Sequence, residues 1–312
     1  MPGAARGLLR SFAAAVAAVG AWAGSVVLHR ALDEGHARSV ERSAAAKAVA
    51  VPQSEVSHPA PPTTAPGLRA LSVPDPRTPG GTRTVLVWRP NVPESRDLPV
   101  VYFLHGLPGT ASDWTRHGAV PALDTAMVAG ARPFVAVFPD GATGNNLDTE
   151  WGDDAQGRVD LETFVTGPLI RAVEGGNLRD RAHRAIAGFS MGGFAATSIA
   201  LRHPNLYGQA ASLAGYFHID DPAHIFADPS RHDPSLLLSE ARRVRLLLVD
   251  GSDDHQPVVE GETQRFSALL RLHHIAVEER LTPGGHTVPW AVAQLPMVAQ
   301  FFGEGWGEVV TS

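Results

Sequence analysis

The most informative absences in this 312-residue sequence are those of cysteine and of a strong charge imbalance. Without cysteine the chain has no disulfide bonds and no thiolate metal sites, although this does not distinguish the cytoplasm from the exterior. The net charge of −6 lacks the basic excess that nucleic-acid binding needs, so we expect no nucleic-acid partner. We also find no internal repeat. With 44% hydrophobic residues, the chain can instead bury one large core.

The N-terminal segment has the pattern of an export signal or a membrane anchor. Arg6 and Arg10 precede an uncharged, mostly apolar run, residues 11–28, which is slightly shorter than the roughly 20 residues of a spanning helix. The Ala-Trp-Ala triplet at 21–23 suits a cleavage site. We therefore predict that residues 1–30 are a cleaved signal peptide or a retained anchor that associates with a membrane, with a soluble alanine-rich helix as the third interpretation. Either of the first two makes the protein secreted or membrane-anchored, with its folded domain outside the cytoplasm.

The segment that follows has the composition of a linker. Residues 31–67 are polar, rich in alanine and proline, and end in SHPAPPTTAPG. Such a segment cannot bury a core. We therefore expect a linker over residues 31–67 and a folded catalytic domain over residues 68–312.

Strand and helix patterns alternate along this domain. The runs LPVVYFLHG (98–106) and PFVAVFPDG (133–141) are almost continuously apolar, as expected of strands buried on both faces. The alternation predicts an α/β fold with a doubly wound, mostly parallel sheet and helices on both faces. The expected strands are 68–73, 83–90, 98–106, 133–141, 184–187, 209–216, 244–251 and 275–281, and the expected helices are 119–130, 161–170, 191–201, 260–273 and a last helix that ends near Phe302.

One short motif carries the main functional hypothesis. Gly188-Phe189-Ser190-Met191-Gly192 fits the G-x-S-x-G pattern of a nucleophile elbow. The pattern alone is weak evidence, but here an apolar strand precedes it and a helical pattern follows it. A strand, a tight turn and a helix would present the Ser190 hydroxyl at the edge of the sheet. The alternative is a small residue in an ordinary strand-to-helix loop.

A serine nucleophile needs a base, and a histidine base needs a carboxylate that fixes its tautomer. His286, in TPGGHTVPW just after the last predicted strand, is the best placed of the histidines, whereas His203 and the pair His273-His274 end helices and fit capping roles. The acid should follow the strand VRLLLVDG, where Asp250, Asp253 and Asp254 all qualify by position. The residues themselves do not separate these three.

The oxyanion of an acyl-transfer reaction needs two N–H donors. The Met191 amide, directly after the serine, and the Leu107 amide, in HGLPGT after a central strand, are the candidates. His105 precedes the serine in the chain and fits a structural role in this loop. Trp151, Tyr216 and Trp290 are candidate substrate-binding residues for an acyl or aryl pocket, with ordinary core packing as the alternative.

The order of these motifs resembles the α/β-hydrolase superfamily and, within it, the putative-esterase family, which includes esterase D-like hydrolases, feruloyl and enterochelin esterases, and mycolyltransferases. The resemblance covers roughly residues 68–303. The stretches that carry it are YFLHGLPG with Asp113-Trp114, FPDG, IAGFSMGGFAA, LLLVDGSDDHQ and PGGHTVPW.

The resemblance implies a role for each candidate. It makes Ser190 the nucleophile and His286 the base, and it places the second oxyanion amide at Leu107. The family acid in a G-x-x-D pattern falls on Asp254, which looks more like the esterase D and feruloyl esterase branches than the mycolyltransferases, whose acid is typically glutamate. In the family an aromatic residue often follows the catalytic histidine closely, whereas here residues 287–289 separate it from Trp290.

Together these patterns predict a serine esterase that hydrolyses a carboxylic ester through an acyl-enzyme, using a Ser-His-Asp triad. The substrate would be a small molecule or an ester of the cell envelope. We expect no metal and no organic cofactor. The alternatives are an acyltransferase that uses the same triad, a non-catalytic binding protein on a hydrolase scaffold, and a peptidase or amidase on this fold.

Overall fold

The computed structural model describes residues 66–92, 97–219 and 221–308. The predicted signal peptide or anchor (1–30) lies outside these ranges, as does all but the last two residues of the predicted linker (31–67). Within the described ranges, no helix is long and apolar enough to cross a membrane. The first strand, β1, begins at Leu68, where we expect the folded domain to begin.

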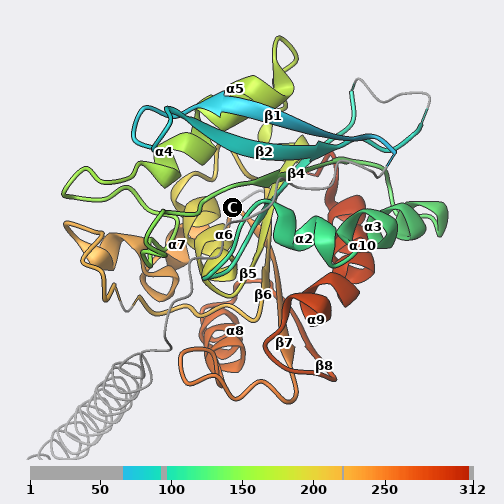
Figure 1. The fold of residues 1–312 in the computed structure, drawn as a ribbon. Helices are drawn as coiled ribbons and strands as arrows, with labels where there is room; N and C mark the ends of the chain where they lie inside the picture. The colour runs from blue at the N-terminus through green and yellow to red at the C-terminus, as the bar shows by residue number, and fades with distance from the viewer. Residues whose placement is uncertain (1–65, 93–96, 220, 309–312) are drawn as a thin grey trace, which may run out of the picture. The chain divides into compact units, whose positions relative to one another are not determined.

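A sheet of eight strands runs through the centre of the described residues (Figure 1). Its spatial order is β1-β2-β4-β3-β5-β6-β7-β8. β1 pairs antiparallel with β2, and β2 pairs antiparallel with β4, whereas the strands from β4 to β8 pair parallel. The prediction of a mostly parallel sheet is therefore confirmed. The strands are β1 Leu68–Pro74, β2 Thr82–Trp88, β3 Val100–Leu104, β4 Val135–Pro139, β5 Arg184–Phe189, β6 Gln209–Leu213, β7 Arg245–Gly251 and β8 Glu278–Thr282.

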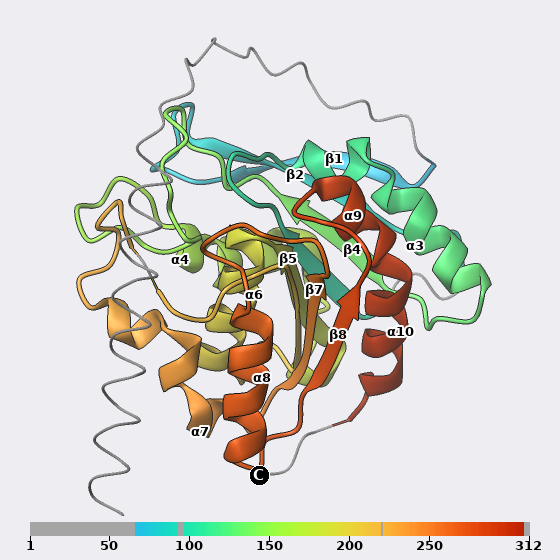
Figure 2. The ribbon, with the colours of Figure 1, turned by 90° about the horizontal axis from the view of Figure 1, so that it is seen from below.

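Helices cover both faces of this sheet. Figure 2 shows α3, α9 and α10 on one face and α6, α7 and α8 on the other. Because both faces are covered, β3, β4, β5 and β6 are buried along their whole length, which explains the apolar runs in the sequence. The α-helices are α2 Ser112–Arg116, α3 Ala119–Val128, α4 Leu161–Thr166, α5 Pro168–Glu174, α6 Met191–Arg202, α7 Leu238–Ala241, α8 Glu262–Leu272, α9 Val288–Ala293 and α10 Leu295–Gly305, and the short 3₁₀ helices are Arg181–His183, Pro229–His232 and Pro234–Leu236.

The single helix expected over residues 161–170 is instead two helices, α4 and α5. They meet at Gly167, and Pro168 is the first residue of α5. Proline has no N–H to continue the hydrogen-bond ladder and disfavours helical backbone at the residue before it. Apolar periodicity continues across the break, which is why the pattern alone predicts one helix.

Strand β8 begins three residues later than expected, because Ile275 completes the preceding helix. His274 has φ +56° beyond the end of α8, and its N–H bonds to the Arg271 carbonyl at 3.0 Å. The Ile275 N–H bonds to the Leu270 carbonyl at 2.9 Å, and its side chain is buried. These two bonds form a Schellman motif, so the backbone at Ile275 serves the helix and not the sheet.

The parallel strands bring the ends of four strands to one edge of the sheet. Leu104 of β3 pairs with Gly188 of β5, and Gly251 of β7 pairs with Thr282 of β8. Strand β6 lies between β5 and β7, and since all these strands are parallel, the loops that follow them emerge at the same end of the sheet. These loops, with the adjoining end of β7 and start of α6, contain every residue for which the sequence predicts a catalytic or oxyanion role. This agrees with the rule that sites of such sheets lie at the carboxyl ends of strands.

Candidate active site

Ser190 lies on a strained turn between β5 and α6. Its backbone has φ +58° and ψ −121°, a conformation that residues with a side chain rarely adopt and that clusters at functional sites. Two glycines make the turn fit: a Cβ on Gly188 would lie 2.0 Å from the Gly192 carbonyl oxygen, and a Cβ on Gly192 would lie 2.3 Å from the Leu104 carbonyl oxygen. The G-x-S-x-G spacing is thus a requirement of close backbone packing, and it raises the serine above the strand end.

The loop between β8 and α9 brings His286 to this serine. His286 Nε2 lies 2.8 Å from Ser190 Oγ, and its ring packs against Phe189 with ring centroids 4.8 Å apart. Thr287 caps α9 by accepting a hydrogen bond from the Trp290 N–H at 3.2 Å. The cap fixes where the helix begins and so holds the residue before it in place.

Asp254 lies on the far side of the His286 ring, and it is the aspartate that the histidine contacts. Its Oδ2 is 2.7 Å from His286 Nδ1, its Oδ1 accepts the Gln256 N–H at 3.1 Å, and its side chain is 1% exposed. A carboxylate only accepts hydrogen bonds, so Nδ1 carries the proton and Nε2 is free to accept from the Ser190 hydroxyl.

The other two aspartates that the sequence leaves open hold the backbone instead. Asp253 Oδ2 accepts the Gly284 N–H at 3.3 Å and so ties the β7 loop to the β8 loop. Asp250 Oδ1 accepts the Gly251 N–H at 2.8 Å, and burial raises the pKa of this carboxyl to about 6. Their positions match the predicted region, but neither contacts a histidine ring nitrogen closely enough for a hydrogen bond.

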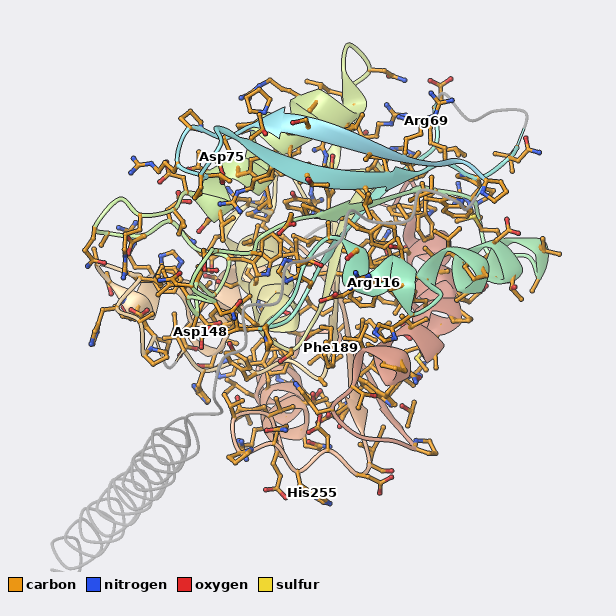
Figure 3. All side chains as sticks on the ribbon, in the orientation of Figure 1. Arg69, Asp75, Arg116, Asp148, Phe189 and His255 are labelled. Carbon is orange, nitrogen blue, oxygen red and sulfur yellow. The ribbon has the colours of Figure 1, made fainter. Side chains whose placement is uncertain are left out.

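The remaining histidines considered as bases lie elsewhere. His203 ends α6, and its Nε2 bonds to Glu162 Oε1 at 2.6 Å, whereas His273 ends α8, so both take the capping positions expected of them. His255, in the loop after β7, lies at the margin of the molecule in Figure 3, and its side chain is 76% exposed. Phe189, also labelled there, is buried. His105 is buried and has both ring nitrogens bonded to the backbone.

Two backbone amides beside Ser190 have no hydrogen-bond acceptor among the described residues: those of Leu107 and Met191. Met191 is the first residue of α6, where the helix dipole favours negative charge. The Leu107 loop runs close past the serine, since a Cβ on Gly106 would lie 3.1 Å from Ser190 Cβ. Unpaired donors at this position are suited to bind an oxyanion.

A cavity of about 150 Å³ opens beside Ser190 and His286. The sequence did not predict its apolar wall, because this wall includes residues of α2 and α9, which are distant in the chain and are brought together by the fold. Its residues all lie within motifs singled out for other reasons, such as Trp114 next to Asp113 and Phe189 within the elbow. The apolar lining residues are Leu107, Pro108, Trp114, Phe189 and Val288.

The three aromatic residues predicted to bind substrate, Trp151, Tyr216 and Trp290, are not among the residues that line this cavity. Trp151 is fully buried and donates its Nε1–H to the His105 carbonyl at 3.0 Å. The Tyr216 hydroxyl donates to the buried Glu150 carboxylate, and Trp290 Nε1 donates to Thr282 Oγ1 at 3.1 Å. All three are core residues whose polar atoms have protein partners, the alternative that the sequence left open.

A metal centre needs a cluster of ligating side chains. In the described part of the chain, no group of three or more His, Asp or Glu side chains is arranged to hold an ion. The polar groups that converge at the Ser190 edge are instead one hydroxyl, one imidazole, one carboxylate and two amides.

Comparison with known proteins agrees with the motif pattern. A family model described as "Putative esterase" matches residues 77–295. The chain is 34% identical over 127 residues to a protein named "Putative esterase NocK" from Nocardia uniformis subsp. tsuyamanensis, a stretch that covers 40% of this chain and 35% of the relative. The match thus spans about a third of that relative's length.

Solved structures resemble the fold over most of the chain. A ferulic acid esterase aligns with a TM-score of 0.65 and 23% identity, covering 77% of this chain and 98% of its own. An S-formylglutathione hydrolase from Agrobacterium tumefaciens aligns with a TM-score of 0.66 and 19% identity, covering 78% and 98%. Likeness at this identity concerns the fold alone, and it confirms the predicted α/β-hydrolase fold.

Proposed function

The chain belongs to the putative-esterase family, and from this premise we propose that it is a serine esterase that hydrolyses a carboxylic ester through an acyl-enzyme. The observation that carries the proposal is the unbroken hydrogen-bond path from Asp254 through His286 to Ser190, at 2.7 and 2.8 Å. This path activates a hydroxyl beside a cavity and two unpaired amides, which is what acyl transfer requires.

In the acylation step, Ser190 Oγ attacks the ester carbonyl carbon while His286 Nε2 takes the hydroxyl proton. The carbonyl oxygen becomes an oxyanion that accepts hydrogen bonds from the Leu107 and Met191 amides. Asp254 stabilises the imidazolium through its bond to Nδ1. His286 then gives the proton to the leaving alcohol oxygen as the carbon–oxygen bond breaks, which leaves the acyl group on Ser190.

Deacylation repeats these steps with water. His286 Nε2 takes a proton from the water, whose oxygen attacks the acyl carbon, and the same two amides bind the second oxyanion. Collapse of this intermediate releases the carboxylic acid and returns the proton to Ser190 Oγ. None of these steps calls for a metal ion or an organic cofactor.

We propose that the acyl group is short and that it occupies the cavity. A cavity of about 150 Å³ holds a group of roughly the size of benzene, or about six carbon atoms. The apolar lining favours a hydrocarbon chain over a charged one. Whether the natural ester is a free small molecule or part of the cell envelope depends on its alcohol portion, which leaves before hydrolysis is complete.

The test is a panel of p-nitrophenyl esters with acyl chains of two to twelve carbons, assayed with wild type and with Ser190→Ala. We expect kcat/KM to be highest at six carbons or fewer and to fall for longer chains. Wild-type turnover no faster than that of the Ser190→Ala control would contradict the esterase proposal. A maximum at ten or twelve carbons would contradict only the assignment of the cavity to the acyl group.

Acyl transfer to an alcohol would use the same triad, so the acceptor decides between the two activities. An acceptor alcohol would need a polar site near Ser190, and the polar, glycine-rich segment 141–158 has its central residues, 149–152, buried. We therefore propose water as the main acceptor. Adding trehalose to the ester assay should leave acid release unchanged, and accumulation of a sugar ester in its place would favour the transferase.

We also propose that residues 1–30 direct the protein out of the cytoplasm, as a cleaved signal or as an anchor, and that residues 31–67 link this segment to the catalytic domain. The support is the sequence pattern alone. A tagged full-length chain should be found outside the cytoplasm or in the membrane fraction, and deletion of residues 1–30 should return it to the cytosol. Full-length protein confined to the soluble cytosol would contradict this.

A further inference from the structure

The peptide unit that joins Gly106 to Leu107 has a hydrogen bond to its carbonyl oxygen and none to its N–H among the described residues. Its carbonyl oxygen lies 2.8 Å from His105 Nδ1, and its N–H is the Leu107 amide, unpaired beside Ser190. In a trans peptide the C=O and N–H point in opposite directions. A bond that fixes the direction of the Gly106 oxygen therefore fixes the direction of the Leu107 N–H.

The tautomer of His105 follows from its second contact. The Gly141 N–H donates to His105 Nε2 at 2.9 Å, so Nε2 carries no proton and Nδ1 must carry it. The ring is then a neutral donor toward the Gly106 oxygen. Burial of the ring lowers the pKa of His105, which keeps it in this neutral form.

Segment 141–151 holds the ring in position. The Trp151 indole lies against it, with ring centroids 4.9 Å apart, and donates to the His105 carbonyl at 3.0 Å. A Cβ on Gly141 would lie 2.6 Å from the Trp151 ring, so only glycine allows both contacts. Glu150 and Trp151 both have positive φ, +49° and +54°, which is backbone strain of the kind that persists at functional positions.

From this geometry we propose that His105 is a positioning residue for catalysis, which aims the Leu107 N–H at the oxyanion by holding the carbonyl of the same peptide unit. The inference rests on the proposed esterase function and adds a residue to it. Donation to the carbonyl oxygen also polarises the peptide, which makes its N–H a stronger donor. A loop histidine with a purely structural role would stabilise the fold without affecting the oxyanion.

The two ring nitrogens of His105 can be tested separately with an amide. In His105→Asn the side-chain NH₂ occupies the place of Nδ1 and keeps the donor to Gly106, whereas in His105→Gln the amide reaches the place of Nε2 and keeps only the acceptor for Gly141. Both variants lose the ring, so we expect similar decreases in Tm. We expect kcat to fall roughly 10- to 100-fold in His105→Gln, somewhat less than deletion of an oxyanion donor, with KM little changed. In His105→Asn, kcat should stay within about threefold of wild type because the donor remains.

A second measurement addresses the oxyanion directly. The inhibition constant of a trifluoromethyl ketone, whose adduct with Ser190 carries an oxyanion, should rise in His105→Gln by the same factor by which kcat/KM falls. If kcat falls equally in both variants and in step with Tm, His105 is only structural and the inference is wrong. If wild type hydrolyses no ester faster than Ser190→Ala does, the proposed function fails and the inference falls with it.

Trp151→Phe keeps the test decisive if neither His105 variant folds. It keeps an aromatic ring at this position and removes the bond to the His105 carbonyl, together with the distal indole atoms that lie against Gly141. We expect kcat, measured well below the unfolding transition, to fall severalfold with KM nearly unchanged, since one neutral hydrogen bond contributes about 1 kcal/mol. Tm should fall as well, because the smaller ring leaves a gap at a fully buried position. An unchanged kcat in this variant would contradict the proposal that His105 positions the Leu107 N–H.

Discussion

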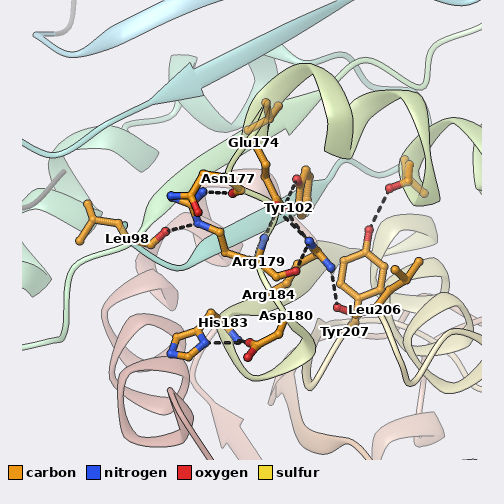
Figure 4. Close-up of polar contacts among 12 residues, drawn as sticks. Leu98, Tyr102, Glu174, Asn177, Arg179, Asp180, His183, Arg184, Leu206 and Tyr207 are labelled. Carbon is orange, nitrogen blue, oxygen red and sulfur yellow. Dashed lines mark hydrogen bonds and ion pairs between the residues drawn. The ribbon is translucent and has the colours of Figure 1, made fainter. Parts of the chain in front are cut away.

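Two buried carboxylates of this molecule, Glu174 and Asp254, occupy very different surroundings. Glu174 lies with Arg184 and Tyr102 in a cluster near the start of β5 (Figure 4). One of its oxygens accepts from the Tyr102 hydroxyl at 2.9 Å and from Arg184 Nε at 2.8 Å, and the other accepts from Arg184 Nη2 at 2.7 Å and from the Arg179 N–H at 2.6 Å. Asp254 instead contacts an uncharged imidazole and one backbone N–H.

The difference shows how one fold separates stability from chemistry. Glu174 is paired with a permanent cation, Arg184, through two parallel hydrogen bonds, and its four acceptor sites are filled. Its interactions are therefore already complete in the resting protein. Burial and the neighbouring carboxylate raise the pKa of Tyr102 well above its usual range, which keeps that hydroxyl a donor. Asp254 gains its cationic partner only when His286 takes a proton from Ser190. Its interaction is strongest in the transition state, where it contributes to rate.

The largest expected effect on the reactive side of this comparison comes from Ser190→Ala. Removal of the hydroxyl deletes the nucleophile, so kcat for ester hydrolysis should fall by several powers of ten while Tm stays close to wild type. Esterase assays and thermal unfolding on the same preparation measure both. Turnover above about a tenth of wild type, a barrier change of only about 1.4 kcal/mol, would assign the chemistry to another residue.

Asp254→Asn should have the next largest effect. The amide can donate to Nδ1 and so favours the tautomer in which Nε2 carries the proton, which lowers kcat by up to about 10⁴-fold with little change in fold. Asp253→Asn is the matched control, since that side chain contacts the Gly284 N–H and not the histidine. If the control loses as much activity as Asp254→Asn, the assignment of the acid to Asp254 is wrong.

Glu174→Gln should show the opposite pattern. It leaves the buried Arg184 guanidinium without a counter-charge, so the free energy of unfolding should fall by about 3–5 kcal/mol, with kcat of the folded enzyme unchanged. Glu278→Gln, in a half-exposed pair with Arg245, is the control and should cost about 1 kcal/mol or less. Urea unfolding and esterase assays below the transition distinguish the two. A large fall in kcat in Glu174→Gln would mean that the two regions are coupled.

The parts of this comparison that the sequence predicts are those set by local patterns. Continuous apolar runs in β3 and β4 reveal a sheet covered on both faces, and the glycine spacing around Ser190 reveals the elbow. These features depend on residues close in the chain, so composition and spacing are sufficient to find them.

The parts that spacing leaves open depend on contacts between distant segments. Only the path of the loop after β7 determines which of Asp250, Asp253 and Asp254 reaches His286. The hydrogen bond between Asp253 and Gly284 of the next loop holds this path in place. Trp151 is a pocket candidate by composition, yet the strained turn at Glu150 directs its indole to the His105 carbonyl. The cavity wall joins α2 and α9, which lie more than 150 residues apart in the chain.

The smallest expected effect concerns a third carboxylate, Asp250, which forms no ion pair with a described residue. Burial raises its pKa to about 6, and the nearby Asp254 adds to this while His286 opposes it. An acid whose pKa is higher in the folded state than its ordinary 3.8 holds its proton longer when folded, so its ionisation weakens stability as pH rises from about 4 to 6. Asp250→Asn keeps an oxygen acceptor for the Gly251 N–H without the charge. Its Tm should therefore exceed that of wild type at pH 7 and match it below pH 4, with kcat little changed. A Tm that is lower than wild type at pH 7 would mean that the Asp250 charge stabilises the fold.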